Sequence, residues 1–240
     1  MIRTAFVVLA ACAYLLFVFT PKFFVSLITR KTDALYRAGV RGCRMAVWLA
    51  GIRVEVCGRE KIPKDRAVIF MPNHQSMCDP PAMMASLPPV FVLLKRSLFR
   101  IPVLGPAMRM HGFVPIDREH RERAMQAVEE AAAKLRSGHS FLVYPEGTRT
   151  RDGRLLPFKK GAFVMAMRAQ APIVPVSVSG AYKIMRKGGM ALHPGTVRIT
   201  FHEPVSTEGY AADDRRVVME KVRAAIITGL AEDEKPASAA

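Results

Sequence analysis

An uncharged apolar run at the start of the chain constrains its fold more than any other feature. From Thr4 to Pro21 there is no charged residue, with Arg3 before the run and Lys22 after it. That length is at the lower limit for a helix that crosses a bilayer. Pro21 is expected to kink or end the helix, although apolar residues continue beyond Lys22. The sequence therefore predicts a membrane-binding helical segment, either one tilted span or a hairpin that enters one leaflet.

Basic residues downstream of this run indicate its orientation. Arg37, Arg41 and Arg44 lie on a predicted helical segment, which suits a surface of lipid headgroups. The positive-inside bias then places the remaining chain at the cytoplasmic face of the inner membrane. A cleaved signal peptide is not expected, because bulky and basic residues follow the apolar run instead of a small-x-small site. We assign residues 1–50 to this membrane-associated segment.

The net charge calls for an acidic partner. The 240 residues carry a formal charge of +16, and apolar residues make up 50% of them. Nucleic acid, anionic lipid and phosphorylated substrates all fit such a charge. The apolar N-terminus, and the lack of aromatic residues between the basic runs, argue against nucleic acid. We therefore expect anionic membrane lipids as partners and no nucleic acid.

The cysteines exclude two further classes. The four cysteines include no C-x-x-C pair, and one lies inside the apolar run. This distribution is typical of reduced thiols and not of a disulfide framework or a zinc site. The sequence predicts no metal.

Short apolar runs alternate with helical segments through the rest of the chain. Runs rich in β-branched residues predict strands at 53–58, 67–72, 90–95, 112–117, 140–145, 172–180 and 195–205. Helices are predicted from Arg118 to Gly138, from near Gly161, and over 211–230. This alternation predicts an α/β fold, with a mixed, mostly buried β-sheet flanked by helices over 51–230. Residues 231–240 are predicted to form a disordered tail.

The sequence PNHQSMCDP, from Pro72 to Pro80, follows a predicted buried strand and contains a candidate catalytic pair. The imidazole of His74 can take a proton from a hydroxyl, and the Asp79 carboxylate can hold its tautomer. A structural interpretation also fits, with Asp79 as the N-cap of a helix and Pro80 at its first position. Both interpretations are open at this point.

Two rival nucleophiles lie between these residues. Ser76 or Cys78 would allow a covalent mechanism in principle. Both lie in the short turn between His74 and Asp79, from which reach to His74 is geometrically awkward. We favour direct attack by a substrate hydroxyl.

A basic loop forms a second constellation in YPEGTRTRDGRLLPFKKG. Gly147 allows the backbone to approach a ligand closely, and Arg149 offers a planar fork for two phosphate oxygens. The alternative is an ion pair between Glu146 and Arg149 in an ordinary surface turn. Basic residues outnumber acidic ones here, which favours an anion site.

A third basic and apolar stretch lies between Asp79 and Asp117. It has no carboxylate but contains Lys95 and three arginines among apolar residues, as suits a lipid with a phosphate head. Asp117 and Arg118 can alternatively be caps of the following helix.

Four blocks together resemble a known family. NHQSMCD, GFVPIDR, YPEGTR and IVPVSVSG occur in this order, and over about residues 50–205 they resemble the glycerolipid acyltransferases. Within that superfamily the chain is most similar to the 1-acylglycerol-3-phosphate acyltransferases. Tyr144 stands where phenylalanine is commoner in the family, and Thr150 where serine is commoner.

The resemblance implies roles for individual residues. His74 would deprotonate the acceptor hydroxyl, which attacks an acyl thioester, and Asp79 would orient His74. Arg149 would hold the acceptor phosphate with Lys95. Further binding or supporting residues implied by the blocks are Gly112, Ile116, Asp117, Arg118, Glu146, Gly147 and Thr148. Pro175 would be architectural or face the donor.

The resemblance also implies the reaction. We expect a membrane-bound acyltransferase that moves an acyl group from acyl-CoA or acyl carrier protein to lysophosphatidic acid, giving phosphatidic acid without a cofactor. Another acceptor, such as a lyso-ornithine lipid or another lysophospholipid, is an alternative. A non-catalytic lipid-binding protein of the same fold is the alternative from a different class.

Overall fold

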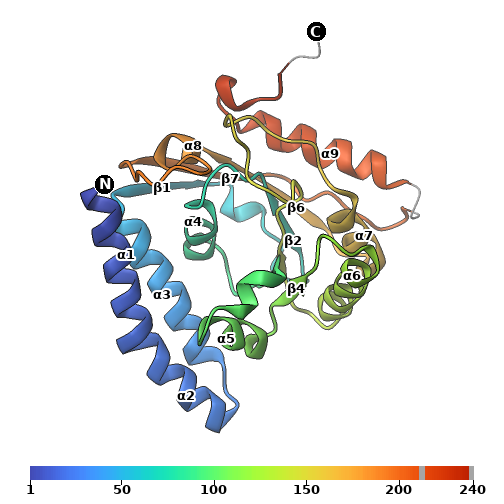
Figure 1. The fold of residues 1–240 in the computed structure, drawn as a ribbon. Coiled ribbons are helices and arrows are strands. Elements are labelled where there is room, and N and C mark those ends of the chain that lie inside the picture. Colours follow the sequence, from blue (N-terminus) through green and yellow to red (C-terminus); the bar gives the residue numbers. More distant parts are fainter. Residues whose placement is uncertain (211–213, 238–240) are drawn as a thin grey trace.

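A mixed seven-stranded sheet with helices on both faces forms the centre of the protein (Figure 1). The computed structural model describes residues 1–210 and 214–237. The strands are β1 (Ile52–Cys57), β2 (Ile69–Pro72), β3 (Phe91–Lys95), β4 (Val114–Ile116), β5 (Phe141–Leu142), β6 (Ile173–Ser179) and β7 (Gly195–Phe201). Each lies within a predicted strand or overlaps it, so the α/β prediction is confirmed.

The strand order places the ends of four strands at one edge. The order is β1-β7-β6-β2-β5-β3-β4, and only the β6–β7 pair is antiparallel. All four residues of β2 are buried, as expected for a strand covered on both faces. Because β2 to β6 are mutually parallel, the segments that follow β2, β3, β4 and β5 meet at the same edge of the sheet.

Two helical layers bury the sheet. The helices of the domain are α4 (Asp79–Ser86), α5 (Leu104–His111), α6 (Arg121–Arg136), α7 (Lys160–Ala169), α8 (Ala181–Ile184) and α9 (Arg215–Thr228), with short 3-10 turns at Arg59–Lys61, Arg96–Arg100 and Glu232–Glu234. Alanine-rich α6 packs with α7 and α9 in one core, while α4 and α8 belong to the core on the other face. The predicted helix over 211–230 corresponds to α9, and residues 211–213 lie outside the described residues.

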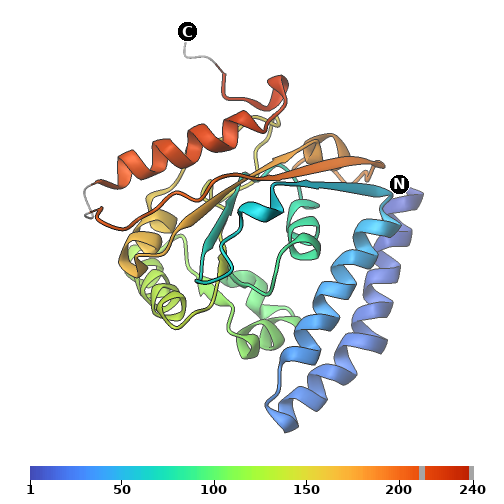
Figure 2. The same cartoon turned by 180° about the vertical axis from the view of Figure 1, so that it is seen from behind.

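The N-terminal arm is a helical hairpin beside this domain, shown in blue in Figures 1 and 2. It consists of α1 (Ile2–Tyr14), the π-helix η1 (Leu15–Phe19), α2 (Thr20–Thr29) and the returning helix α3 (Asp33–Leu49). The helix does not end at Pro21, so that alternative is wrong. The wider π turn just before Pro21 accommodates the missing N–H, and the Thr20 hydroxyl donates to the Leu15 carbonyl at 2.8 Å.

The outward face of the arm is apolar. Ile2–Thr29 is long and apolar enough to cross a membrane by length and composition, and it is hardly buried against the rest of the chain. Large exposed side chains on it include Phe6, Leu9, Leu16, Phe17, Phe24 and Ile28. The sequence prediction of an apolar N-terminal helix is confirmed. Its division from the domain at residue 50 stays a prediction.

The end of the chain is packed where the sequence predicted a disordered tail. Glu234 is 3% exposed, and its side chain accepts a hydrogen bond from Gly180 N–H at 2.7 Å. Its backbone carbonyl accepts a hydrogen bond from Leu155 N–H. The prediction is therefore wrong for residues 231–237, because these contacts offset the ordering of the backbone. Residues 238–240 lie outside the described residues.

Candidate active site

His74 and Asp79 lie in direct contact at the edge where β2 ends. His74 Nδ1 is 2.8 Å from Asp79 Oδ2, and the His74 side chain keeps 16% of its surface exposed. The carboxylate accepts the Nδ1 proton, which leaves Nε2 of the imidazole as the proton acceptor. The predicted pair is thus assembled with one ring nitrogen held and the other available.

Asp79 is fully buried and also organises the turn that carries His74. Its Oδ2 accepts the backbone N–H groups of Gln75 at 2.6 Å and Ser76 at 2.7 Å. Asp79 is the first residue of α4, and Cys78 occupies the N-cap position. The N-cap interpretation of Asp79 is therefore wrong by one position, and the positive end of the α4 dipole still favours its charge.

Glu146 supports the backbone of His74 from the neighbouring strand connection. Its side chain accepts His74 N–H at 2.6 Å through Oε1 and Leu156 N–H at 3.0 Å through Oε2. Burial raises the pKa of this carboxyl to about 8. The alternative of a surface ion pair with Arg149 does not hold, because Glu146 is 2% exposed and uses both oxygens for backbone groups.

Further hydrogen bonds join the sequence blocks. Thr150 N–H donates to the His74 carbonyl at 3.0 Å. The Asn73 amide exchanges two hydrogen bonds with the backbone of Val178, at 2.7 and 2.8 Å. His74 is therefore held between β6 and the loop after β5. Thr150 supports it through its backbone N–H and not through its hydroxyl.

Tyr144 forms one wall of the site. Its ring stacks on the His74 imidazole with centroids 4.1 Å apart and planes inclined by 28°. Its buried hydroxyl has no hydrogen-bond partner among the described residues, and burial raises its pKa well above the usual value. The ring, which tyrosine shares with phenylalanine, is thus the part that contacts the candidate base.

A cavity of about 200 Å³ with a cationic side lies behind Tyr144. Apolar residues of β3, β4, α6 and α7 line it together with Arg118 and Lys159. Arg118 donates to the Gly147 carbonyl. Gly147 has φ 68°, a conformation that side chains rarely adopt, so glycine is favoured there, and a Cβ would come within 2.9 Å of the Lys159 side chain. Arg118, Gly147 and Lys159 are therefore brought together.

Arg149 and Thr148 lie on the rim of this loop. Lys187 Nζ donates to the Thr148 hydroxyl at 3.0 Å and to the Arg149 carbonyl at 2.9 Å. The Arg149 guanidinium makes no hydrogen bond or ion pair within the described part of the chain. Its five donors remain available to an anion.

The remaining predicted residues divide between the two edges of the sheet. Lys95 ends β3 and pairs in register with Ile116 of β4, so both lie at the edge of His74. Asp117 follows them and accepts Glu119 N–H, and α6 begins only at Arg121 with no side-chain cap, so Asp117 does not cap it. Gly112 lies at the opposite edge, before β4.

Gly112 has a structural explanation. It follows the last residue of α5 with φ 109°, and a Cβ would approach the Phe91 ring to 2.6 Å. Its carbonyl accepts Lys134 Nζ at 2.9 Å. The structure thus does not bring Gly112 to the site. Pro175 lies in β6 opposite Met71, and its carbonyl accepts His202 N–H at 3.0 Å beside the β6–β7 pairing that begins at Val176.

The two rival nucleophiles are occupied or inert. The Ser76 hydroxyl donates to the Met185 carbonyl at 2.7 Å. Burial raises the pKa of the Cys78 thiol to about 11, which keeps it protonated at neutral pH. These environments favour attack by a substrate hydroxyl.

The fold and the site together define a class of protein. An imidazole oriented by a buried carboxylate, beside a cationic cavity at the edge of an α/β sheet, is built for general-base chemistry on an anionic substrate. Residues 53–179 match the family model described as Acyltransferase, which is more than half of the 240 residues. The chain belongs to the acyltransferase family.

Named relatives narrow the family. The chain is 36% identical over 155 residues to the 1-acyl-sn-glycerol-3-phosphate acyltransferase BAT2 of Brassica napus, covering 64% of this chain and 45% of that protein. It is 37% identical over 186 residues to the alpha enzyme of Mus musculus, covering 76% of this chain and 65% of that one. The chain thus spans less than two thirds of these relatives.

A solved structure is similar over nearly the full chain. The crystal structure of the 1-acyl-sn-glycerophosphate (LPA) acyltransferase PlsC from Thermotoga maritima aligns with TM-score 0.81 and 31% identity. The alignment covers 94% of this chain and 93% of that one. The chain therefore shares the fold of that lysophosphatidic acid acyltransferase, and an alignment of this extent takes in most of the N-terminal arm.

Three supporting residues were not assigned a role from sequence. Asn73 lies inside the first block and was unassigned because its partner, Val178, is distant in the chain. Tyr144 stands where phenylalanine is commoner in the family, and its position beside the PEGTR block is a signal that it lies near the site. Lys187 lies in no block, so only the fold shows that it contacts the Thr148 hydroxyl and the Arg149 carbonyl.

Proposed function

We propose that this chain is a 1-acylglycerol-3-phosphate O-acyltransferase. It would move a fatty acyl group from acyl-CoA or acyl carrier protein to the free hydroxyl of lysophosphatidic acid, giving phosphatidic acid. The observation that carries the proposal is the 2.8 Å contact between His74 Nδ1 and the buried Asp79 carboxylate. The names of the relatives support the choice of acceptor.

The proposed step balances without a cofactor. His74 Nε2 takes the proton of the acceptor hydroxyl as its oxygen attacks the thioester carbonyl carbon. The tetrahedral intermediate collapses, the C–S bond breaks, and the imidazolium returns the proton to the leaving thiolate. Asp79 stabilises the imidazolium while it exists. The acyl donor is a substrate.

Cationic residues would position the acceptor. The Arg149 guanidinium offers a bidentate fork to phosphate oxygens, and Arg118 and Lys159 add positive charge to the adjoining cavity. Lys95 adds charge from the end of β3 at the same edge. Fixing the phosphate orients the hydroxyl toward His74, which is where proximity lowers the barrier.

The N-terminal arm would lie in one leaflet at the cytoplasmic face of the inner membrane. The start of α1 contacts the domain, since the Thr4 hydroxyl accepts Leu192 N–H at 3.0 Å. Phe19, farther along, packs with Ala107 of α5. A spanning helix would separate its ends by a hydrocarbon core of about 30 Å, so contacts along its length favour the hairpin.

An acceptor panel tests the proposal. Membranes containing the protein receive acyl-CoA or acyl carrier protein loaded with the same chain, and lysophosphatidic acid, lysophosphatidylglycerol or a lyso-ornithine lipid. We expect transfer to lysophosphatidic acid, and a loss of about 10²- to 10⁴-fold in His74→Ala. His193→Ala, at an exposed loop histidine, is the matched control.

The outcomes separate the alternatives. Unimpaired transfer by His74→Ala would show that His74 is not the general base. Preference for another lysolipid would keep the chemistry and replace the acceptor. Binding of lysolipid without thioester consumption would favour a non-catalytic protein.

A further inference from the structure

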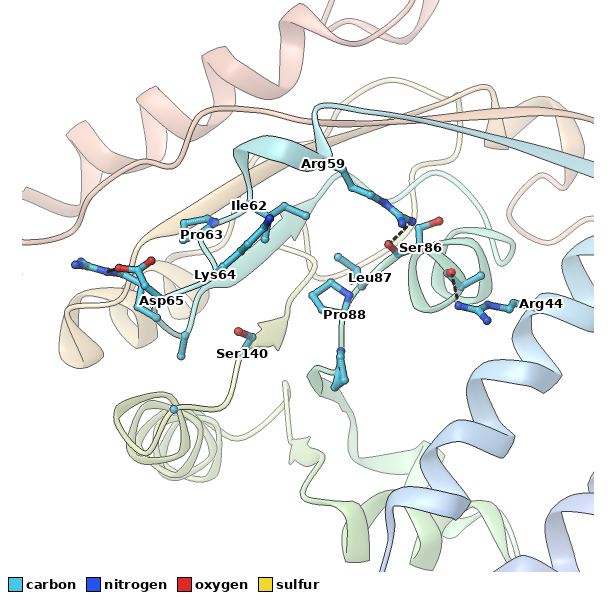
Figure 3. Close-up of a pocket in the computed structure, with 15 residues that line it drawn as sticks. Arg44, Arg59, Ile62, Pro63, Lys64, Asp65, Ser86, Leu87, Pro88 and Ser140 are labelled. Carbon is cyan, nitrogen blue, oxygen red and sulfur yellow. Dashed lines mark hydrogen bonds and ion pairs between the residues drawn. The ribbon is translucent and has the colours of Figure 1, made fainter.

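A cavity of about 710 Å³ lies at the edge of the sheet opposite His74 (Figure 3). Its walls are the segment before β2, the end of α4 with the following prolines, and the turn before β5. These segments precede parallel strands, whereas the catalytic residues follow them. The volume falls within the range of small-molecule sites. The cavity is therefore separate from the candidate active site.

The lining carries positive charge that the described carboxylates neutralise only in part. Arg44, Arg59, Lys64 and Arg66 line it with a single carboxylate, Asp65. Arg66 is the one cation of the four paired to carboxylates within the described part of the chain, with Asp65 at 3.5 Å and Glu208 at 2.9 Å. Three cations, Arg44, Arg59 and Lys64, thus face the cavity without a carboxylate partner among the described residues.

Two of these cations are held in place by the end of α4. Arg59 donates to the Ser86 carbonyl at 2.8 Å, and Arg44 donates to the Ala85 carbonyl at 3.5 Å, as the dashed lines in Figure 3 show. The C-terminal end of a helix carries a partial negative charge that repels anions. These guanidinium groups offset that charge at the end of α4. Each guanidinium has five N–H donors and makes one hydrogen bond to the described residues, which leaves several donors for a ligand.

We propose that this cavity is a second binding site, for a phosphate ester. Guanidinium groups fixed by backbone carbonyls present forks that match phosphate oxygens, and Lys64 adds a mobile point charge. Arg44 belongs to α3 of the N-terminal arm, where Arg37 and Arg41 precede it, so the phosphate of an anionic lipid headgroup reaches this cavity as readily as a soluble phosphate ester does.

Occupancy of this site also touches the element that carries Asp79. The eight residues of α4 run from Asp79 to Ser86, a length of about 12 Å. A phosphate that shares Arg59 with the Ser86 carbonyl contacts one end of this helix, while the His74 partner lies at the other. The site does not depend on the proposed reaction, and its test needs no activity.

Chemical footprinting of Lys64 tests the site on the full chain in neutral detergent. Acetylation of Lys64 is followed by mass spectrometry with inorganic phosphate or with dihexanoyl phosphatidylglycerol. We expect acetylation to slow about tenfold at a ligand concentration ten times the dissociation constant. Lys221, exposed on α9, is the internal control and should keep its rate. Protection by phosphate alone indicates a soluble ester, and protection by the lipid only indicates a headgroup.

Matched variants complete the design. Arg59→Gln and Arg44→Gln remove the guanidinium charge and keep a neutral polar side chain, so Lys64 protection should disappear. Arg53→Gln, on β1 and paired with Glu55, should leave it unchanged. His74→Ala should also retain protection, which separates this site from the proposed function. Unprotected Lys64 with both probes, equal protection of Lys221, or protection that survives in both arginine variants would overturn the proposal.

Discussion

The turn that carries His74 and the N-terminal arm depart from the usual distribution of side chains in opposite directions. Around His74, polar side chains are buried: Asn73, Gln75, Ser76, Asp79, Glu146 and Thr150 are each at most 2% exposed. On the arm, large apolar side chains are exposed, with Phe17 at 73% and Ile28 at 84%. Burial of polar side chains and exposure of large apolar ones are both unusual in a folded protein, so each arrangement indicates a functional role.

The difference teaches where the compensating partner lies. The buried polar groups find partners inside the chain, mostly backbone groups, and the resulting network fixes one geometry for the imidazole. The exposed apolar side chains of the arm are not covered by any described residue, and contiguous exposed apolar surface marks a contact with another molecule or a membrane. The polar groups around His74 are thus paired largely within the chain, whereas the apolar face of the arm calls for a partner outside it.

The largest effect is expected for Asp79→Asn, which tests whether the buried carboxylate has a role in turnover. An amide keeps the volume but loses the charge that orients and stabilises the His74 imidazolium, so we expect the turnover rate to fall about 10³- to 10⁴-fold. Acyl transfer and thermal melting are measured together, with exposed Asp65→Asn as control. Near-normal turnover would show that the buried contact is structural.

The arm is tested by a double substitution on its exposed face. Phe17→Asp with Phe24→Asp removes two apolar side chains from the proposed membrane surface. Each is worth about 1.5–3 kcal/mol when buried, so binding to vesicles should weaken at least about 100-fold. The melting temperature should stay close to that of the parent protein.

Val217→Asp is the matched control, because Val217 is exposed at 44% on α9 in the catalytic domain. Co-sedimentation with vesicles gives the binding. Equal binding by all three proteins would show that the apolar face of the arm does not contact lipid.

Glu146→Gln tests the buried network through the pH dependence of the free energy of unfolding. Burial raises the pKa of Glu146 from 4.5 to about 8, so the folded chain keeps a proton that the unfolded chain releases. Its contribution to the free energy of unfolding is fully present below pH 4.5 and is lost as pH rises through about 8. The Gln variant lacks this titration, so its stability relative to the parent should increase with pH.

Urea melts at several pH values between 4.5 and 8 measure this difference. Removal of one acceptor oxygen adds a pH-independent cost of about 1–3 kcal/mol. Parallel curves for the two proteins across this window would contradict the assignment of the titration to Glu146.

Cys78→Ala should have the smallest effect. The thiol is buried and its pKa is about 11, so it takes no part in the proposed step. We expect turnover within a few fold of the parent protein and a small loss of stability from the missing sulfur. Abolished transfer in a variant that still folds would restore a covalent mechanism.

Much of the fold followed from local patterns. All seven strands were predicted, because buried strands read as short β-branched runs whatever their neighbours are. The mixed sheet was expected from the alternation, but the order β1-β7-β6-β2-β5-β3-β4 was not, since pairing joins segments far apart in the chain. The predicted boundaries of elements were wrong where tertiary or local contacts, not composition, decide the structure. The tail around Glu234 and the helix that continues through Pro21 are the two cases.

The sequence by itself determined the chemistry that is available: an imidazole five positions before a carboxylate, a glycine and arginine loop, and an apolar N-terminus. These depend on residue type and short spacing. Only the tertiary structure decided which residues meet, because hydrogen bonds such as those from His74 N–H to Glu146 and from Val178 N–H to Asn73 cross 72 and 105 positions. The fold places Gly112 at the far edge of the sheet and Tyr144 against the candidate base His74, since the direction and burial of a side chain are properties of the packed chain.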